Sequence, residues 1–236
     1  MTEKLVFLTR RASQLSREEF LRRYLDEHAP LVLQHCPNLR KYVVNLVDVS
    51  REKRDPPPLG ENAAVFDAVA EYWFDSLDDF TDPARRFDSS EGAAAVDDSE
   101  AANIGAMVGY QVIERVHQDY ERSWSDGERS PGVKLLATVR RAEGFTHEQF
   151  VDHWLHKHVP FVFKVLLGTW RYVTNEVVAP LTPGAPEIDG IVEVHFRDIR
   201  DRRFDSPEGE ALMAEDVQQF LLQPTRNQAS EYVLRS

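Results

Sequence analysis

The pattern of hydrophobic and polar residues occurs twice along the chain. A short apolar run opens each half, at residues 5–9 and 135–139, and predicts a buried strand. Aromatic residues and a histidine then recur at a spacing of four, which places them on one buried face of a helix. This face comprises Phe20, Tyr24 and His28 in the first half, and Phe150, Trp154 and His158 in the second.

The helix that carries this face has a clear start in both halves. It begins at Ser16 or Thr146, and each is followed three residues later by a Glu or Gln that completes a capping box. Pro30 and Pro160 are expected to interrupt or kink the helix, because proline has no backbone N–H to donate.

The later elements also correspond. Residues 67–74 alternate between two faces, with Tyr72 and Phe74 on one face and Glu71 and Trp73 on the other. The remaining elements are strands around Tyr42 and Tyr172, a third strand ending at Phe196 in the second half, helices at 91–103 and 208–222, closing strands at 107–115 and 230–235, and Pro-rich loops such as 55–60. Each half therefore has the order βαββαβ.

The two halves are copies of one unit. Residues 4–45 align with residues 134–175 without a gap, and about a third of the aligned positions are identical. Ordered matches of this length indicate gene duplication. We expect one domain at 1–116, a polar linker at 117–131 and a second domain at 132–236.

The βαββαβ order predicts an α+β fold of the ferredoxin-like type, with both helices on one face of an antiparallel sheet. The other face must be covered by something apolar. We therefore expect the two domains to pack sheet to sheet as an intrachain pseudo-dimeric α+β barrel. The alternative is that each sheet is covered by another chain, and a homodimer of the tandem chain is also left open.

Composition narrows the partners. The chain is 42% hydrophobic and 29% charged, as in globular proteins, and its net charge is −12. This charge argues against nucleic acid and anionic membranes as main partners. The single cysteine, Cys36, allows no intrachain disulfide and indicates a reducing compartment, so a cytoplasmic location is expected. His153 and His156, three residues apart, are a weak metal signal, and we expect no metal.

The repeated motifs resemble the EthD family of the dimeric α+β barrel superfamily. They are the Arg-Arg pair after the first strand, S/T-x-E-x-F, H-x-P, Y-V-x-N, and D-x-x-x-F from Asp216 to Phe220 in the second copy. In the first copy Asp97 or Asp98 is expected to supply the acid, and no Phe follows. The resemblance implies the barrel fold and leaves the chemistry open, since relatives in the superfamily include cofactor-free cyclases, dehydratases and monooxygenases as well as haem enzymes.

The candidate catalytic residues are His28, His158, Tyr42 and Tyr172. A buried imidazole titrates near neutral pH and can move protons without a cofactor, and a phenol can bind a carbonyl oxygen. The equal alternative for each histidine is a structural hydrogen bond near the proline, and a plain strand role is favoured for each tyrosine. Candidate substrate-binding residues are Phe20, Tyr24, Phe150, Trp154, Tyr72 and Phe196.

Charged residues offer further candidates. Glu71 and Glu193 lie on the strand face that points between the sheets, and partners are expected among Lys4, Lys134, Arg10 and Arg140. An interface salt-bridge network is favoured over an acid–base pair of Glu193 and His195. The Arg-Arg pairs at 10–11, 85–86, 140–141 and 202–203 could bind an anionic substrate, although solvated or paired arginines are favoured.

The leading functional prediction is a cofactor-independent enzyme that uses proton transfer on a hydrophobic small molecule, as a lyase, cyclase or isomerase. No cofactor is expected. One alternative is a non-catalytic protein that binds a hydrophobic compound for a partner enzyme. Another is an oxygenase, either cofactor-free or linked to haem. The intact D-x-x-x-F motif and Trp154 favour the second copy as the working half.

Overall fold

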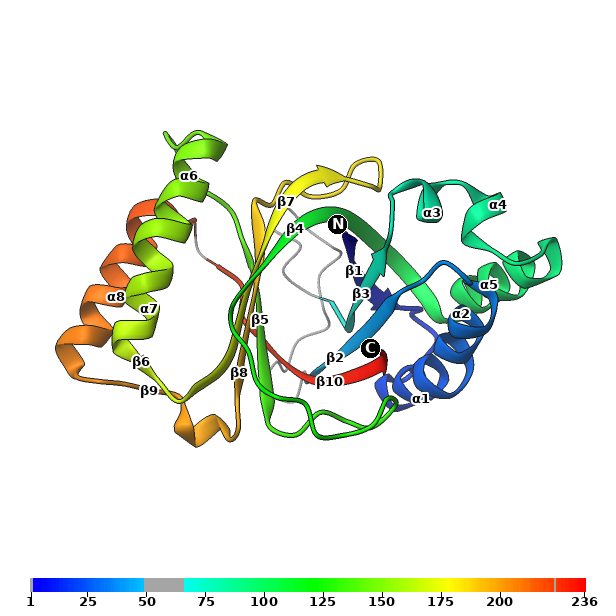
Figure 1. The fold of residues 1–236 in the computed structure, drawn as a ribbon, viewed down its shortest axis with the longest axis horizontal. Helices are drawn as coiled ribbons and strands as arrows, with labels where there is room; N and C mark the ends of the chain where they lie inside the picture. Colours follow the sequence, from blue (N-terminus) through cyan, green and yellow to red (C-terminus); the bar gives the residue numbers. More distant parts are fainter. Residues whose placement is uncertain (1, 49–65, 223) are drawn as a thin grey trace.

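The computed structural model describes residues 2–48, 66–222 and 224–236 (Figure 1). The first copy contains β1 (Glu3–Arg11), α1 (Arg17–Arg23), the π-helical turn η1 (Tyr24–His28), α2 (Ala29–His35), β2 (Lys41–Asp48), β3 (Ala68–Phe74), α3 (Asp78–Thr81), α4 (Pro83–Arg86), α5 (Ser90–Asn103) and β4 (Ile104–Gln118). The Pro-rich loop predicted at 55–60 lies outside the described residues.

The second copy repeats this order. It contains β5 (Val133–Val139), α6 (His147–His153), the π-helical turn η2 (Trp154–His158), α7 (Val159–Val165), β6 (Leu166–Leu167), β7 (Thr169–Pro180), β8 (Gly190–Phe196), η3 (Ile199–Asp201), β9 (Arg203–Phe204), α8 (Pro207–Phe220) and β10 (Asn227–Arg235). None of the described helices is long and apolar enough to cross a membrane.

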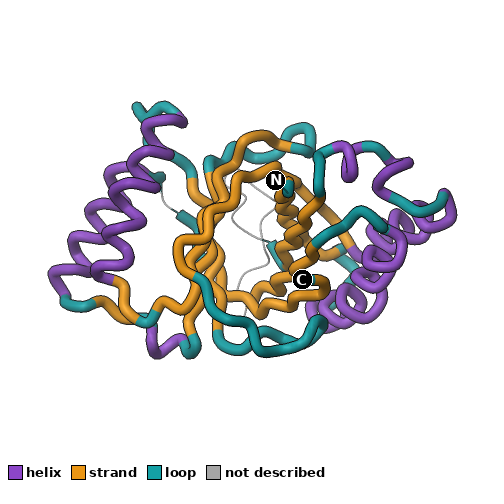
Figure 2. Tube along the Cα trace, viewed as in Figure 1, coloured by secondary structure: helices purple, strands orange, loops and turns teal. Residues whose placement is uncertain are grey.

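The sheets of the two copies join into one closed barrel. Its strand order is β1-β3-β2-β10-β5-β8-β7-β4. The copies are linked at both edges, because β4 pairs with β7 and β10 pairs with β2. The helices of each copy lie outside the barrel, on opposite sides (Figures 1 and 2). The predicted α+β pseudo-dimeric barrel is confirmed, and the edge pairing leaves no open strand among the eight.

The alternation along each strand separates two environments. In β3, Ala68, Ala70 and Phe74 belong to the core beneath the helices, whereas Val69 belongs to the core inside the barrel. The faces assigned to β3 from the sequence are therefore correct.

Both capping boxes form as predicted. The side chains of Ser16 and Thr146 accept from the backbone N–H three residues later. The helix is interrupted by a π-helical turn just before the proline, where the N–H of Ala29 donates to Tyr24 O and the N–H of Val159 donates to Trp154 O. The helix then continues through the proline, which sits in its first turn, where its missing N–H costs little.

Several predicted boundaries differ from those of the structure, and the closing strand of the second copy begins at Asn227 instead of residue 230. The closing strand of the first copy extends over Ile104–Gln118, well beyond 107–115, because it pairs with β1 along one part and with β7 of the other copy along the next. The second helix of the second copy ends at Phe220, not at residue 222. The segment after β4 also contributes buried groups, since Tyr120 and Ser130 hydrogen-bond Glu231 at one end of the barrel.

Candidate functional site

A cavity of about 130 Å³ lies between the sheet and the helices of the second copy. Strands β5 and β8 form its floor, and η2, α7 and α8 form its walls. Its lining is mostly aliphatic and aromatic, and it includes His158, Trp154, Tyr172, Val194, Phe196 and Met213. The inner space has about the size of one aromatic ring, and it opens through a mouth into an outer groove along α8.

The cavity exists because two strand positions carry small residues. Leu5 lies opposite Tyr72 in the first copy, and Leu135 lies opposite Val194 in the second, so Tyr72 corresponds to Val194. By the same register, Phe7 corresponds to Ala137. The replacement of two rings by a valine and an alanine leaves space in the second copy.

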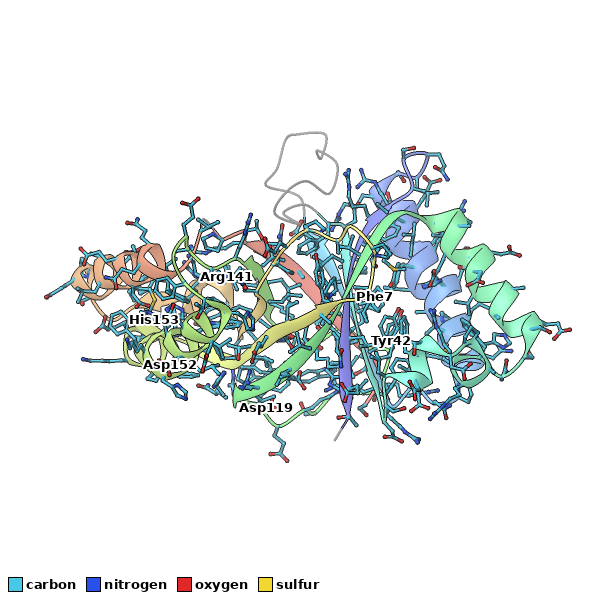
Figure 3. All side chains as sticks on the ribbon, turned by 90° about the horizontal axis from the view of Figure 1, so that it is seen from above. Phe7, Tyr42, Asp119, Arg141, Asp152 and His153 are labelled. Carbon is cyan, nitrogen blue, oxygen red and sulfur yellow. The ribbon has the colours of Figure 1, made fainter. Side chains whose placement is uncertain are left out.

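The same region of the first copy is filled by its own side chains. Tyr72 stacks on Tyr42 at 4.7 Å between ring centroids, and Phe7 contacts both Tyr72 at 5.7 Å and Phe80 at 5.4 Å. Phe7 and Tyr42 lie on the first-copy side of the molecule, far from His153 among the helices of the second copy (Figure 3).

One polar group in the cavity is held by a carboxylate. The Nδ1 atom of His158 lies 2.6 Å from Asp216 Oδ2, and the Nε2 atom of His153 lies 2.8 Å from Asp216 Oδ1. Burial acts to raise the pKa of Asp216, but hydrogen bonds from the two histidines outweigh it and lower that pKa. With Nδ1 bonded to Asp216, Nε2 is the nitrogen of His158 available to a ligand.

Local structure fixes this pair of side chains. His158 is the last residue of the π-helical turn η2, and turns of this kind occur frequently at functional sites. Asp216 lies on α8, one turn before Phe220. The ring of Phe220 stacks on His153 at 4.5 Å and lies 5.0 Å from His158, so it holds both imidazoles against Asp216.

The first copy lacks this carboxylate. His28 is buried, and its Nδ1 atom lies 3.3 Å from Ser99 Oγ. Helices α5 and α8 have equal lengths, so Ser99 occupies the place of Asp216. The expectation that Asp97 or Asp98 supplies an acid is wrong, since both point to solvent on the far side of α5. Burial, with the nearby charge of Arg86, lowers the pKa of His28 to about 4.

The two predicted tyrosines lie in different surroundings. Tyr172 is buried and lines the cavity, whereas Tyr42 is buried in the closed aromatic cluster of the first copy. Burial raises the pKa of both phenols. Each therefore stays protonated at neutral pH and can donate a hydrogen bond, but it cannot act as a base.

The cavity unites only part of the predicted binding set. Trp154 and Phe196 line it, and Phe150 packs behind Trp154 at 5.2 Å between ring centroids. Phe20, Tyr24 and Tyr72 pack in the hydrophobic core of the first copy. The sequence prediction missed Asp216 as the partner of His158, although the D-x-x-x-F motif marked it. It also missed Ala137 and Val194, which only a comparison of the two copies would reveal.

The barrel interior holds the predicted salt-bridge network. Lys134 Nζ lies 2.8 Å from Glu71, 2.7 Å from Glu193 and 2.9 Å from Glu231, and Lys4 bridges Glu71 and Glu193 from the other side. Lys4 and Lys134 are thus the partners of the buried glutamates.

Of the other first-strand candidates, Arg140 pairs with Glu187 at 3.2 Å, outside this network. The neighbouring guanidinium groups of Arg11 and Arg141 pair instead with Asp67 and Asp189.

Among the described residues, two groups of barrel side chains lie close enough to hold a metal ion, and a lysine fills each of them. Lys4 contacts Glu71, Glu114 and Glu193, which form one group. Donor atoms of Glu193, His195 and Glu231 lie within 4.8 Å of one another. The ammonium group of Lys134 already occupies the place of a cation, because it contacts both of these glutamates. Burial lowers the pKa of His195 to about 4, so its ring is neutral beside Glu231.

Three solved structures share this fold. The chain is similar to an anthrone oxidase-like protein (10% identity, 100% of this chain and 94% of that chain covered, TM-score 0.64). It is also similar to two proteins described provisionally as monooxygenases. One comes from Lactobacillus acidophilus (9% identity, 99% of this chain and 97% of that chain covered, TM-score 0.52). The other comes from Fusobacterium nucleatum (9% identity, 99% of this chain and 93% of that chain covered, TM-score 0.53). At these identities, the likeness concerns the fold alone.

The comparison with curated proteins gives no significant match. A model of the EthD domain matches residues 12–102 and again residues 142–223, most of both copies. These matches contain the histidine of each π-helical turn, Ser99 in the first copy and Asp216 in the second. The chain therefore belongs to the EthD family and carries two EthD domains in tandem.

Proposed function

We propose that the second-copy cavity is the active site of an enzyme that moves protons on a hydrophobic small molecule, with His158 as general base. The observation that carries this proposal is the 2.6 Å hydrogen bond between His158 Nδ1 and Asp216, made by a residue that lines an apolar cavity. An imidazole oriented by a carboxylate is a recurrent arrangement for general base catalysis.

In the proposed step, neutral His158 donates Nδ1–H to Asp216 and takes a proton from a carbon next to a carbonyl group through Nε2. Asp216 then stabilises the imidazolium that forms. The phenol of Tyr172 lines the same cavity and is protonated at neutral pH, and in this proposal it donates to the developing enolate oxygen. Return of the proton to another carbon gives an isomerase. Attack of the enolate carbon on a second carbonyl carbon, with the proton passed to the oxygen that becomes an alkoxide, gives a cyclase. Breakage of the bond to a β leaving group, which departs with the proton, gives a lyase. Positioned proton transfer contributes about 10²- to 10⁴-fold in rate.

The first copy is proposed to be a scaffold. Its corresponding space is filled by Phe7, Tyr42 and Tyr72, and Ser99 replaces the carboxylate. A neutral hydroxyl stabilises an imidazolium much less than a carboxylate does. Its barrel strands nevertheless complete the fold on which the second copy depends.

A cofactor-free oxygenase is the second candidate, because it begins with the same proton abstraction and the similar structures carry oxidase and monooxygenase descriptions. The carbanion formed would pass electrons to O₂. For anthrone, one O₂ would give anthraquinone and one water.

Anthrone in D₂O offers a direct test, because part of this three-ring molecule can enter the inner cavity while the rest lies in the adjoining outer groove. Its acidic ring CH₂ protons exchange with solvent when a base removes them, and ¹H NMR follows their loss. We expect the protein to accelerate this exchange, and His158→Gln to reduce the acceleration by about 10²-fold or more. His28→Gln is the matched control from the first copy and should exchange as the unchanged protein does.

The outcomes separate the candidates. Equal acceleration by the unchanged protein and His158→Gln would contradict the assignment of the base. Oxygen consumption that accompanies exchange would favour the oxygenase. Saturable anthrone binding without exchange or oxygen consumption would favour the binding protein over either enzyme.

A further inference from the structure

Two arginines lie at the mouth of the second-copy cavity. Arg202 and Arg226 both line the cavity, and both also line the outer groove that continues from it along α8. Arg202 is half-buried, with its guanidinium 5.7 Å from the ring centre of Phe204, and Arg226 is exposed at the rim. The mouth of an otherwise apolar pocket therefore carries two positive charges.

Arg202 belongs to an Arg-Arg pair whose first-copy counterparts, Arg85 and Arg86, are both neutralised by carboxylates. Arg85, which matches Arg202 in the repeated R-R-F-D-S motif, lies 2.5 Å from Asp79. Its neighbour Arg86 lies 3.7 Å from Glu100. In the first copy, where no cavity lies beneath the motif, both of its arginines are therefore paired with carboxylates.

In the second copy the same motif lacks such pairing. Within the described ranges, no carboxylate forms an ion pair with Arg202 or Arg226, although the chain has 40 acidic and 28 basic residues. Glu210 lines the outer groove but pairs with neither.

Arg226 is itself a difference between the copies. Val112 of β4 lies opposite Lys4, and Ala229 of β10 lies opposite Lys134, so Val112 corresponds to Ala229. Three residues earlier in each copy, Gly109 therefore corresponds to Arg226. A side chain at Gly109 has no room, since a Cβ atom there would lie 2.3 Å from the ring of Phe7. The loss of that ring in the second copy opens the cavity, and the glycine is replaced by a cation at its rim.

We infer that the ligand of this cavity is an apolar or aromatic carboxylate, whose body enters the cavity and whose charge is bound by Arg202 and Arg226 at the mouth. This inference rests on the proposed function, because it takes the second-copy cavity as the ligand site. A carboxylate suits the planar guanidinium group, which can donate two parallel hydrogen bonds to it. Since the inner cavity holds about one ring, the charged end of a larger ligand must lie near the rim.

The test compares 2-naphthoate with 2-naphthamide, which has nearly the same shape and no charge, by isothermal titration calorimetry on the full chain. We expect naphthoate to bind at least about 10-fold more tightly, and this preference to fall as salt is added. Arg202→Gln and Arg226→Gln should each weaken naphthoate about 10- to 100-fold and leave naphthamide unchanged. Arg203→Gln, an exposed neighbour outside the cavity, is the matched control and should change neither.

Each outcome has one meaning. Equal affinities for both probes, unaffected by either arginine variant, would overturn the carboxylate inference and leave the cavity as the ligand site. Binding that survives Ala137→Phe, which restores the first-copy ring, would place the ligand elsewhere and overturn the inference together with the proposed site. Failure of both probes to bind at millimolar concentration would also overturn the inference. The anthrone exchange assay uses an uncharged probe, so its result does not depend on these arginines.

Discussion

Removal of the central cation of the barrel should strongly destabilise the protein. Lys134 is 2% exposed and contacts three buried carboxylates, those of Glu71, Glu193 and Glu231. Burial acts to lower the pKa of Lys134, but the three glutamates outweigh it and hold that pKa well above its usual value. Lys134→Met keeps the length of the side chain and removes the charge, so the carboxylates lose their shared partner.

The structure sets the size of the expected loss in the free energy of unfolding. Burial acts to raise the pKa of Glu231, but Lys134 and other partners lower it to about 2. An unfolded glutamate has a pKa of about 4.3, and a difference of about two units corresponds to about 3 kcal/mol of folding free energy at neutral pH. Removal of one partner from a buried ion pair typically costs about 3–5 kcal/mol. We expect Lys134→Met to lose about 3–5 kcal/mol at pH 7.

The pH dependence has a defined sign. The folded pKa of Glu231 is lowered, so its stabilising contribution is fully present above its unfolded pKa and is lost as the pH falls from about 4.3 towards 2. In Lys134→Met the buried carboxylates lose the cation that opposes the effect of burial, so they accept protons at a higher pH than in the unchanged protein. The stability difference between the two proteins should therefore be largest at pH 8 and narrow as the pH falls towards 2.

Urea unfolding followed by tryptophan fluorescence and circular dichroism measures this loss. Glu231→Gln and the double variant Lys134→Met/Glu231→Gln complete a cycle, in which the double variant should lose less than the sum of the single ones by about 1–3 kcal/mol. Lys164→Met removes an exposed lysine from α7 and should change stability by about 0.5 kcal/mol at most. A loss below about 1 kcal/mol for Lys134→Met, or additive single variants, would refute the reasoning.

Three further predictions concern local features. Thr146→Ala should cost about 1 kcal/mol in urea unfolding, because it removes the capping-box hydrogen bond to the Gln149 N–H; an unchanged midpoint would contradict this. Gly109→Ala should cost about 1–3 kcal/mol, because its methyl group would meet the ring of Phe7 in a closed core; a neutral result would mean that the ring can move. Asp216→Asn should cost about 2–3 kcal/mol at pH 7, since it weakens two hydrogen bonds to histidines. The folded pKa of Asp216 is lowered, so this cost should shrink as the pH falls below about 4, and a cost that is constant with pH would disprove the role of its charge.

The sequence alone was sufficient to predict the local structure of this protein. The repeat, the capping boxes at Ser16 and Thr146, and the alternation along β3 depend on neighbouring residues, and the structure contains them all. The need to cover the bare face of each sheet also led directly to an intrachain barrel. These features follow from the periods of helices and strands, which can be read within a few residues.

Only the tertiary structure determined the site. Asp216 contacts His158 from a helix that lies far along the chain, so the sequence pattern around His158 does not reveal this contact. The same pattern does not reveal that Ser99 takes the place of Asp216 in the first copy. The cavity depends on the combined volumes of Ala137 and Val194, which lie on adjacent strands and under the same helices. Close packing makes space a property of all the neighbours together, so identical folds in one chain can give one filled core and one open cavity.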